Sequence, residues 1–285
     1  MTIKKNIVTS DGIELYIERS GKGVPCIYLH GGPGYWSKSF QSIAGNDLEE
    51  DLGMVYLDQR GCGRSAHDPN RNYSLTRLVD DIEEVREQLE ITEWYLLGHS
   101  FGGILAVNYA YRYPEKVTGI ILSNVTLDMV DSFSHQIKKG QEMLNHEPSV
   151  LPLDDLPAFM NVFNSVLAQL ISKDIYYHLQ YSNPNSSKHL SNIDKDMHSD
   201  PSFQQYIFSS QDYFQDFSKL TASIKHPVLI LAGKHDHAIG PDHYKKFNFS
   251  NKQVCVLDSG HHPYVENPLG FKNSIIKFIR EELEK

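Results

Sequence analysis

The chain alternates short apolar runs with longer stretches in which apolar residues recur every three or four positions. The short runs predict buried strands, and the longer stretches predict helices with one buried face. Buried strands are expected at 25–29, 54–57, 94–97, 117–122, 227–233 and 253–257, and residues 6–20 predict a β-hairpin that turns at Asp11-Gly12. Strands that alternate with helices predict an α/β fold, with a mostly parallel sheet covered by helices on both faces.

The pattern changes between residues 124 and 220. Strand signals vanish there, and a cluster of polar turn residues occupies 182–187. Helices are expected at 129–144, 156–170, 175–179 and 202–217. The segment 124–220 therefore predicts a helical cap, inserted into a core formed by residues 1–123 and 221–285. A cap over an active site excludes water and shapes the pocket.

The 285 residues carry a net charge of −9, which argues against nucleic-acid binding and gives no attraction to an anionic membrane. The three cysteines are odd in number and far apart in sequence, and they predict free thiols in a reducing compartment. The polar N-terminus lacks the apolar stretch of a signal peptide, and no run reaches the roughly 20 apolar residues of a transmembrane helix. We therefore expect a cytoplasmic protein; the sequence carries no signal for its oligomeric state.

Candidate chemistry begins at Ser100, which follows an apolar strand in the run Gly98-His99-Ser100-Phe101-Gly102. Gly-x-Ser-x-Gly between a strand and a helix is the pattern of a nucleophile elbow, a tight turn that presents the serine hydroxyl above the sheet. Gly98 and Gly102 leave room where a side chain would collide with the neighbouring backbone. The hydroxyl would lie at the positive end of the following helix. Ser100 is therefore the predicted nucleophile.

Two later loops supply candidate partners for Ser100. Asp236 follows the predicted strand at 227–233, and His261 follows the one at 253–257. The chain order Ser, Asp, His is that of the α/β-hydrolases. In such a triad the histidine takes the serine proton and later protonates the leaving group, while the aspartate orients the histidine and stabilises its charged form. His262 is the competing candidate for the base.

A glycine-rich loop, His30-Gly31-Gly32-Pro33-Gly34, follows the strand at 25–29 and predicts an oxyanion hole. Glycines allow backbone N–H groups to approach a developing negative charge closely. We assign the two donors to the amides of Gly32 and Phe101, since Pro33 has no N–H to donate.

Three motifs together resemble the proline iminopeptidase branch of the α/β-hydrolase superfamily, which also contains tricorn-interacting aminopeptidases. They are the glycine-rich loop 30–34, Asp58-Gln59-Arg60-Gly61-Cys62-Gly63-Arg64-Ser65, and Gly98-His99-Ser100-Phe101-Gly102-Gly103. The resemblance covers the core, from the first strand to residue 125 and from residue 224 to the end. It implies the α/β-hydrolase fold and the release of N-terminal residues, often proline, from short peptides. The Gly-His-x4-Glu-x-Pro pattern of this branch matches His261 rather than His262.

Two departures from this branch leave the substrate open. Many proline iminopeptidases carry Gly or Ser before the nucleophile and Trp after it, whereas His99 and Phe101 stand here, as in general esterases. Some members carry an acid directly after the triad aspartate to hold the free amino group of the substrate, and His237 occupies that position. Such an acid must then come from elsewhere, and the cap carries twelve acids against six lysines. The candidate substrate-binding residues are Gly31, His99, Glu142, Glu147, Asp212 and Asp216.

We therefore predict a serine hydrolase that acts through an acyl-enzyme on a small-molecule or short-peptide substrate, with a proline iminopeptidase-like aminopeptidase as the leading hypothesis. A carboxylesterase or lactonase acting on a small acyl ester would use the same chemistry. A buried acid near the amine position would favour the peptidase, and an all-apolar pocket the esterase. A non-catalytic binding protein on the same fold is the third hypothesis. We expect no cofactor or metal, because the triad explains the histidines near the two loops better than zinc does, which also needs a convergent carboxylate or cysteine set.

Overall fold

The computed structural model describes residues 3–284, and these contain one eight-stranded sheet of order β1-β2-β4-β3-β5-β6-β7-β8. β1 and β2 form the predicted hairpin, β2 also pairs antiparallel with β4, and the other neighbouring strands are parallel. The mostly parallel sheet expected from the sequence is therefore confirmed. The strands are β1 (Ile3–Val8), β2 (Glu14–Ser20), β3 (Val24–Leu29), β4 (Leu52–Leu57), β5 (Trp94–His99), β6 (Val117–Ser123), β7 (Val228–Gly233) and β8 (Lys252–Leu257).

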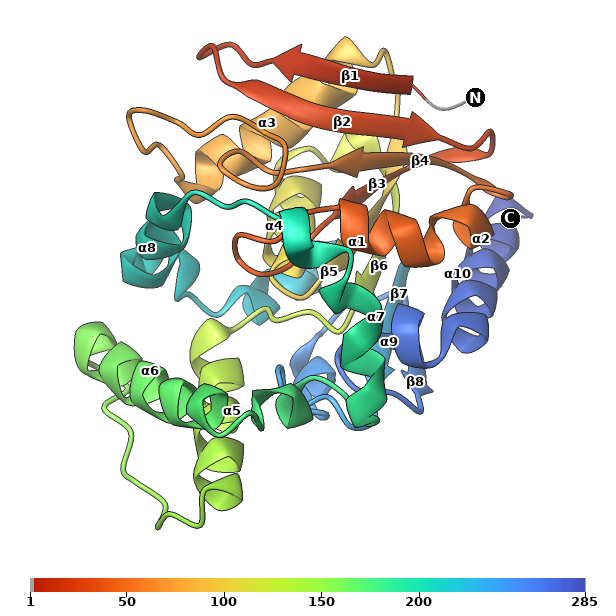
Figure 1. Cartoon of the computed structure of the whole chain (residues 1–285). Helices are drawn as coiled ribbons and strands as arrows, with labels where there is room; N and C mark the ends of the chain where they lie inside the picture. The colour runs from red at the N-terminus through yellow and green to blue at the C-terminus, as the bar shows by residue number, and fades with distance from the viewer. Residues whose placement is uncertain (1–2, 285) are drawn as a thin grey trace.

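Helices cover both faces of the sheet (Figure 1). The face built with Ile27 and Leu29 packs against α3 (Leu75–Gln88) and α4 (Gly102–Arg112). The face built with Cys26 and Tyr28 packs against the other helices, because successive side chains of a strand point to opposite faces. Those helices are α1 (Lys38–Phe40), α2 (Asn46–Leu48) and α10 (Pro268–Leu283), with α9 (Pro263–Glu266) beside α10. The π-helical turn η1 (Gln41–Gly45) joins α1 to α2. Two short 3-10 turns lie elsewhere in the chain, η2 (Pro114–Lys116) and η8 (His243–Lys246).

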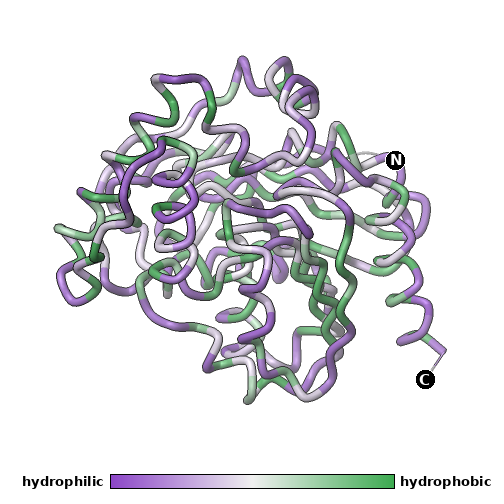
Figure 2. The backbone as a smooth tube through the Cα atoms, turned by 90° about the horizontal axis from the view of Figure 1, so that it is seen from below, coloured by the Kyte–Doolittle hydropathy of each residue, from purple (hydrophilic) through white to green (hydrophobic). Residues whose placement is uncertain are grey.

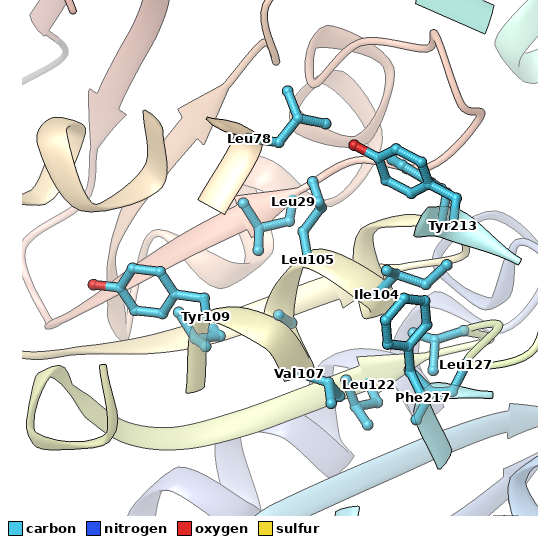
Figure 3. Close-up of a cluster of buried hydrophobic side chains, with 14 of the residues drawn as sticks. Leu29, Leu78, Ile104, Leu105, Val107, Tyr109, Leu122, Leu127, Tyr213 and Phe217 are labelled. Carbon is cyan, nitrogen blue, oxygen red and sulfur yellow. The ribbon is translucent and has the colours of Figure 1, made fainter. Parts of the chain in front are cut away.

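Both helical layers owe their position to amphipathic sequences. In Figure 2 the backbone of α10, which runs to the C-terminal label, alternates between hydrophilic and hydrophobic colours. Ser74 caps α3, because its hydroxyl accepts a hydrogen bond from the Arg77 amide. Apolar side chains of α3 and α4 meet β3 and β6 in one continuous cluster (Figure 3). Ile104 of α4 and Phe217 lie side by side in that view, so the same cluster extends into the segment that follows β6.

The segment between β6 and β7 adds no strand to the sheet within residues 3–284, and α5 and α6 stand apart from the sheet (Figure 1). The single helix expected at 202–217 is wrong, because α8 ends at Ser209. Ser210 adopts an extended backbone, and its hydroxyl accepts a hydrogen bond from the Asp212 amide. The division into core and cap at 123/124 and 220/221 stays a prediction. The helices of this segment are α5 (Met129–Met143), α6 (Leu156–Ser172), η3 (Tyr176–Leu179), η4 (Pro184–Ser186), α7 (Ser187–Ser191), η5 (Asp194–Asp196), α8 (Pro201–Ser209), η6 (Gln211–Tyr213) and η7 (Phe217–Ser223).

Two further expectations concern thiols and membrane spans. Cys26, Cys62 and Cys255 are free, as predicted, and the first two are buried. Among the helices of residues 3–284, none combines the length and the apolar character that crossing a bilayer requires. The carboxyl ends of β3, β5, β7 and β8 lead into the loops that carry the candidate catalytic residues, where ligands bind in sheets of this kind.

Candidate active site

Ser100 forms the turn between β5 and α4. Its φ is 55°, a left-handed backbone conformation that residues other than glycine rarely adopt. This conformation supports the predicted elbow. A Cβ added to Gly102 would lie 2.0 Å from the Leu29 carbonyl oxygen, and one on Gly98 would lie 2.9 Å from the Gly102 carbonyl oxygen. The two glycines therefore let the turn close against β3, which leaves Ser100 only 7% exposed.

Asp236 and His261 meet although they come from different loops. Nδ1 of His261 lies 3.0 Å from Oδ2 of Asp236, and both side chains are buried. Since a carboxylate accepts only, Nδ1 carries the hydrogen; in the neutral ring the lone pair is then on Nε2, where a histidine can accept a proton. His262 is different, because its Nδ1 lies 3.0 Å from the Tyr264 hydroxyl. The hydrogen bond to Asp236 thus distinguishes the two candidate bases in favour of His261.

Ser100 shares a cavity with His261 but forms no hydrogen bond with it. Ser100 and His261 line the same two cavities. Within residues 3–284 the Ser100 hydroxyl makes no hydrogen bond, and Nε2 of His261 makes none either. Catalytic hydrogen bonds often shorten only when substrate binds, so this geometry is compatible with proton transfer from Ser100 to His261.

The Asp236 carboxylate is held in its ionised form. Burial raises its pKa, but the facing His261 and the Asn124 amide, whose Nδ2 lies 2.8 Å from Oδ2, together lower the pKa below its ordinary value. The backbone amides of Ala238 and Ile239 also donate to Oδ1, at 3.0 and 3.1 Å. A carboxylate with this many donors stays charged and fixed in orientation.

Two more buried imidazoles surround His261. Nε2 of His99 donates to the His261 carbonyl oxygen at 3.0 Å, which holds the base loop against the nucleophile strand. Burial lowers the pKa of His99 to about 3 and holds that of His262 well below its ordinary value. Both rings are therefore neutral at pH 7, and they add no positive charge beside His261.

Gly32 and Phe101, whose amides are the predicted oxyanion donors, line a cavity together with Ser100. Neither amide donates a hydrogen bond to another group of residues 3–284. The His30 ring orders this loop. The backbone N–H of Gln59 donates to Nε2 of His30 at 3.0 Å, so the ring hydrogen is on Nδ1. Nδ1 in turn donates to the Gly31 carbonyl oxygen at 3.0 Å. That carbonyl belongs to the same peptide group as the Gly32 N–H, and His30 therefore orients this N–H.

Two cavities meet at Ser100, and they differ in whether a carboxylate lines them. The first has a volume of about 60 Å³ and no carboxylate in its wall; we call it the apolar cavity after Phe101, Met129, Phe133 and Ile239, although Thr126, Gln136 and Gln180 also line it, together with Ser100 and His261. The second, the polar cavity, has a volume of about 180 Å³; it is lined by Ser100 and His261 with Gly31, Tyr35, His99, Tyr181, Asp194 and His262, among others.

The four cap acids named from the sequence lie away from both cavities. Glu142 is 69% exposed and pairs with Lys139, and Glu147 and Asp212 are exposed as well. Asp216 instead caps η7 through the Ser218 amide and hydroxyl. The structure therefore does not bring these four acids to the cavities at Ser100, because Glu142, Glu147 and Asp212 are exposed to solvent and Asp216 is engaged in capping η7.

Sequence reasoning missed Asp194, the one carboxylate that lines the polar cavity among residues 3–284. Its Oδ1 accepts from the Trp36 indole N–H at 3.0 Å and from the Ser39 hydroxyl, and its Oδ2 accepts from the Tyr35 hydroxyl at 2.6 Å. These three donors follow β3, more than 150 residues earlier in the chain. A carboxylate has about four lone-pair sites, so one stays free on Oδ2. No local motif marks Asp194, and only its contacts with residues that follow β3 reveal it.

Comparison with known proteins relates this geometry to a family. A family model described as alpha/beta hydrolase fold matches residues 24–268. A proline iminopeptidase of Arabidopsis thaliana is 41% identical over 125 residues, which is 43% of this chain but only 32% of that protein. A proline iminopeptidase of Heyndrickxia coagulans is 26% identical over 263 residues and covers 88% of each chain. The more identical matches thus span about a third of the relative's length.

Solved structures agree on the architecture. A proline iminopeptidase-related protein from Thermus thermophilus superposes with a TM-score of 0.81 at 20% identity and covers 98% of both chains. An esterase from Exiguobacterium antarcticum superposes with a TM-score of 0.73 at 22% identity, over 98% of this chain and all of that one. At these identities the likeness establishes the fold alone.

Proposed function

Since this chain belongs to the α/β-hydrolase fold family, we propose that it is a serine hydrolase that cleaves its substrate through a covalent acyl-enzyme on Ser100. The observation that carries the proposal is the 3.0 Å contact between Asp236 and His261 at the cavities that Ser100 also lines. A carboxylate, an imidazole and a serine hydroxyl with free amides nearby are the parts that acyl transfer needs.

In the proposed reaction the Ser100 oxygen attacks the substrate carbonyl carbon, and Nε2 of His261 takes the hydroxyl proton. The carbonyl oxygen becomes an oxyanion, which the amides of Gly32 and Phe101 stabilise. His261 then gives the proton to the leaving amine or alcohol, which departs and leaves the acyl group on Ser100. A water molecule then attacks the acyl carbon and gives a proton to His261. The bond to the Ser100 oxygen breaks, His261 returns the proton to that oxygen, and the acid is released. Asp236 orients His261 and stabilises its positive charge.

His30 contributes indirectly to this reaction as a positioning residue, and its role can be tested. We expect His30→Ala to lower kcat by about tenfold to a hundredfold while KM changes little, because a loosened Gly32 N–H weakens binding of the transition state more than that of the substrate. Steady-state kinetics would measure the split, and thermal unfolding would check the fold.

Gln59→Ala is the matched control for that experiment. It removes the side chain that donates to the His30 carbonyl oxygen at 2.8 Å but keeps the backbone N–H that sets the His30 ring. A smaller loss of kcat than in His30→Ala is expected. Equal losses in both variants would contradict the role given to the His30 imidazole.

For the substrate, we infer an aminopeptidase that releases N-terminal residues from short peptides. Curated relatives are named proline iminopeptidases, and one of them matches over 88% of both chains. Asp194 supplies a carboxylate in the polar cavity that can accept a hydrogen bond from a protonated amine. The cap's twelve acids against six lysines also favour a cationic substrate.

A second candidate, hydrolysis of a small acyl ester, is supported by a different observation. The apolar cavity has no carboxylate in its wall, and Asp194 already accepts hydrogen bonds from three side chains of the core. An ester substrate has no free amine and would need only the apolar cavity and the oxyanion donors.

The two candidates separate in one paired assay, which uses prolyl p-nitroanilide beside p-nitrophenyl acetate and butyrate. We expect cleavage of the anilide, and we expect Asp194→Asn to raise its KM about tenfold with little effect on the esters, since only the anilide presents an amine. Asp196→Asn, at an exposed position of the same turn, is the matched control and should change neither rate. Ester cleavage without anilide cleavage would reject the peptidase.

A further inference from the structure

A further cavity lies at the junction of cap and core but outside the two cavities at Ser100. This outer pocket has a volume of about 570 Å³. Lys139 of α5 and His178 of η3 line it from the cap, and His235 and His237 line it from the loop after β7. Its size suits a ligand of one or a few residues, since small-molecule pockets span roughly 300–1,000 Å³.

The ionisable side chains that line the outer pocket are Lys139, three histidines and the Tyr181 phenol, and none of them is a carboxylate. Lys139 donates to Glu142 at 2.9 Å and His235 contacts Asp258 at 3.0 Å, but these carboxylates are 69% and 81% exposed and do not line the pocket. The His178 ring makes no hydrogen bond within residues 3–284, so it can donate to a ligand. A concave site with ammonium and imidazole donors suits an anion.

A metal is the other ligand that histidines suggest. Among residues 3–284, however, no three His, Cys, Asp or Glu side chains converge as a ligand set. Nδ1 of His237 instead lies 3.1 Å from Nε2 of His135 on α5, so the two rings share a hydrogen bond rather than face a common point. The arrangement therefore favours an anion over a cation.

The outer pocket lies next to the cavities at Ser100 and shares part of its wall with one of them. Tyr181 lines both the outer pocket and the polar cavity, and its ring stacks on His262 at 5.0 Å. On the other side, Ala238 lines the apolar cavity directly after His237. The cap backbone is tied there to both triad loops, since the His237 amide donates to the Leu179 carbonyl oxygen and the His261 amide to that of Gln180.

We propose that the outer pocket binds the carboxylate at the far end of the substrate, which in a short peptide is the C-terminal carboxylate. Lys139 is the principal donor, and His178 and His237 add hydrogen bonds. The inference rests on the proposed function, because it makes the pocket a specificity site for peptides cleaved at Ser100. It would select peptides short enough for the carboxylate to reach the pocket while the first residue occupies the cavities at Ser100.

Kinetics on matched peptides test this site. Wild-type protein should cleave prolyl-glycyl-glycine with a kcat/KM about tenfold above that for its C-terminal amide, as expected for one hydrogen bond to a charged group. Lys139→Gln should remove that preference through KM. Lys138→Gln, the exposed neighbour on α5, should keep it. Equal kcat/KM for acid and amide in wild-type protein, or an unchanged preference in Lys139→Gln, would overturn the proposal.

A binding measurement separates this site from the proposed catalysis. Ser100→Ala protein is titrated with glycylglycine and, separately, with glycylglycinamide, and the histidine ring protons are followed by NMR. Signals assigned to His178 and His237 by their loss in His178→Gln and His237→Gln should shift with the acid and not with the amide. If no peptide is cleaved but these shifts occur, the aminopeptidase is wrong and the carboxylate site stands. If neither ligand shifts them, the site is wrong whatever the kinetics show.

Discussion

Replacing Ser100 by alanine is expected to lower kcat by roughly 10³- to 10⁶-fold, with KM changed only a few-fold. The variant loses the oxygen that bonds to the substrate carbonyl carbon, whereas the oxyanion donors and both cavities stay in place. Turnover of whichever substrate the paired assay identifies gives kcat. A fluorophosphonate probe, followed by mass spectrometry of the intact protein, should add one label to wild-type protein and none to the variant.

Ser123→Ala is the matched control, because it removes a buried hydroxyl from β6, the strand that pairs with β5 at the nucleophile. It should keep kcat within a few-fold of the wild-type value and should still react with the probe. A Ser100→Ala protein that retains wild-type turnover would rule out the acyl-enzyme. Wild-type protein that neither turns over any substrate nor reacts with the probe would favour the non-catalytic binding protein instead.

The second large effect is expected at His261. His261→Ala should lower kcat by roughly 10³- to 10⁶-fold, because in the proposed mechanism this imidazole takes the Ser100 proton and delivers it to the leaving group. His262→Ala should lower kcat no more than about tenfold, since the His262 ring contacts Tyr264 and not Asp236. Initial rates of both variants across pH 6 to 9, beside their thermal unfolding midpoints, would give the comparison.

The pair of variants also tests the competing base directly. Both histidines are buried and adjacent in sequence, so a loss caused by disturbed packing would affect both proteins to a similar extent. A His262→Ala protein as inactive as His261→Ala, with both folded, would contradict the assignment of the base. Full activity in His261→Ala would contradict the triad.

The local sequence pattern was sufficient to predict the strands of the sheet, the hairpin turn and the turn at Ser100. Apolar runs of strand length and the Asp11-Gly12 turn concern residues close together in the chain, whose conformational preferences act within a few positions. The elbow at Ser100 was readable for the same reason, since its glycines and the flanking strand are adjacent to the serine. Ser100, Asp236 and His261 each follow a predicted strand, and the ends of parallel strands meet at one edge of a sheet, so their three loops were expected at that edge.

Local pattern was misleading where the helices of the cap end. The apolar spacing of 202–217 continues past Ser209, yet Ser210 adopts an extended backbone there. Hydroxyl side chains can compete with helical hydrogen bonds by binding nearby amides, and this competition is decided by packing around the turn. Periodicity does not carry that information.

The identity of the groups around Ser100 depended on contacts between distant segments. Asp194 reaches the polar cavity because Tyr35, Trp36 and Ser39 hold its carboxylate, and the four cap acids expected there lie elsewhere. Likewise His261 and His262 are nearly equivalent in sequence, and the position of Asp236 separates them. The strands, the turns and the candidate nucleophile follow from short-range preferences. The direction of a charged side chain instead follows from how the segment between β6 and β7 packs on the rest of the chain, and no short stretch of residues encodes that packing.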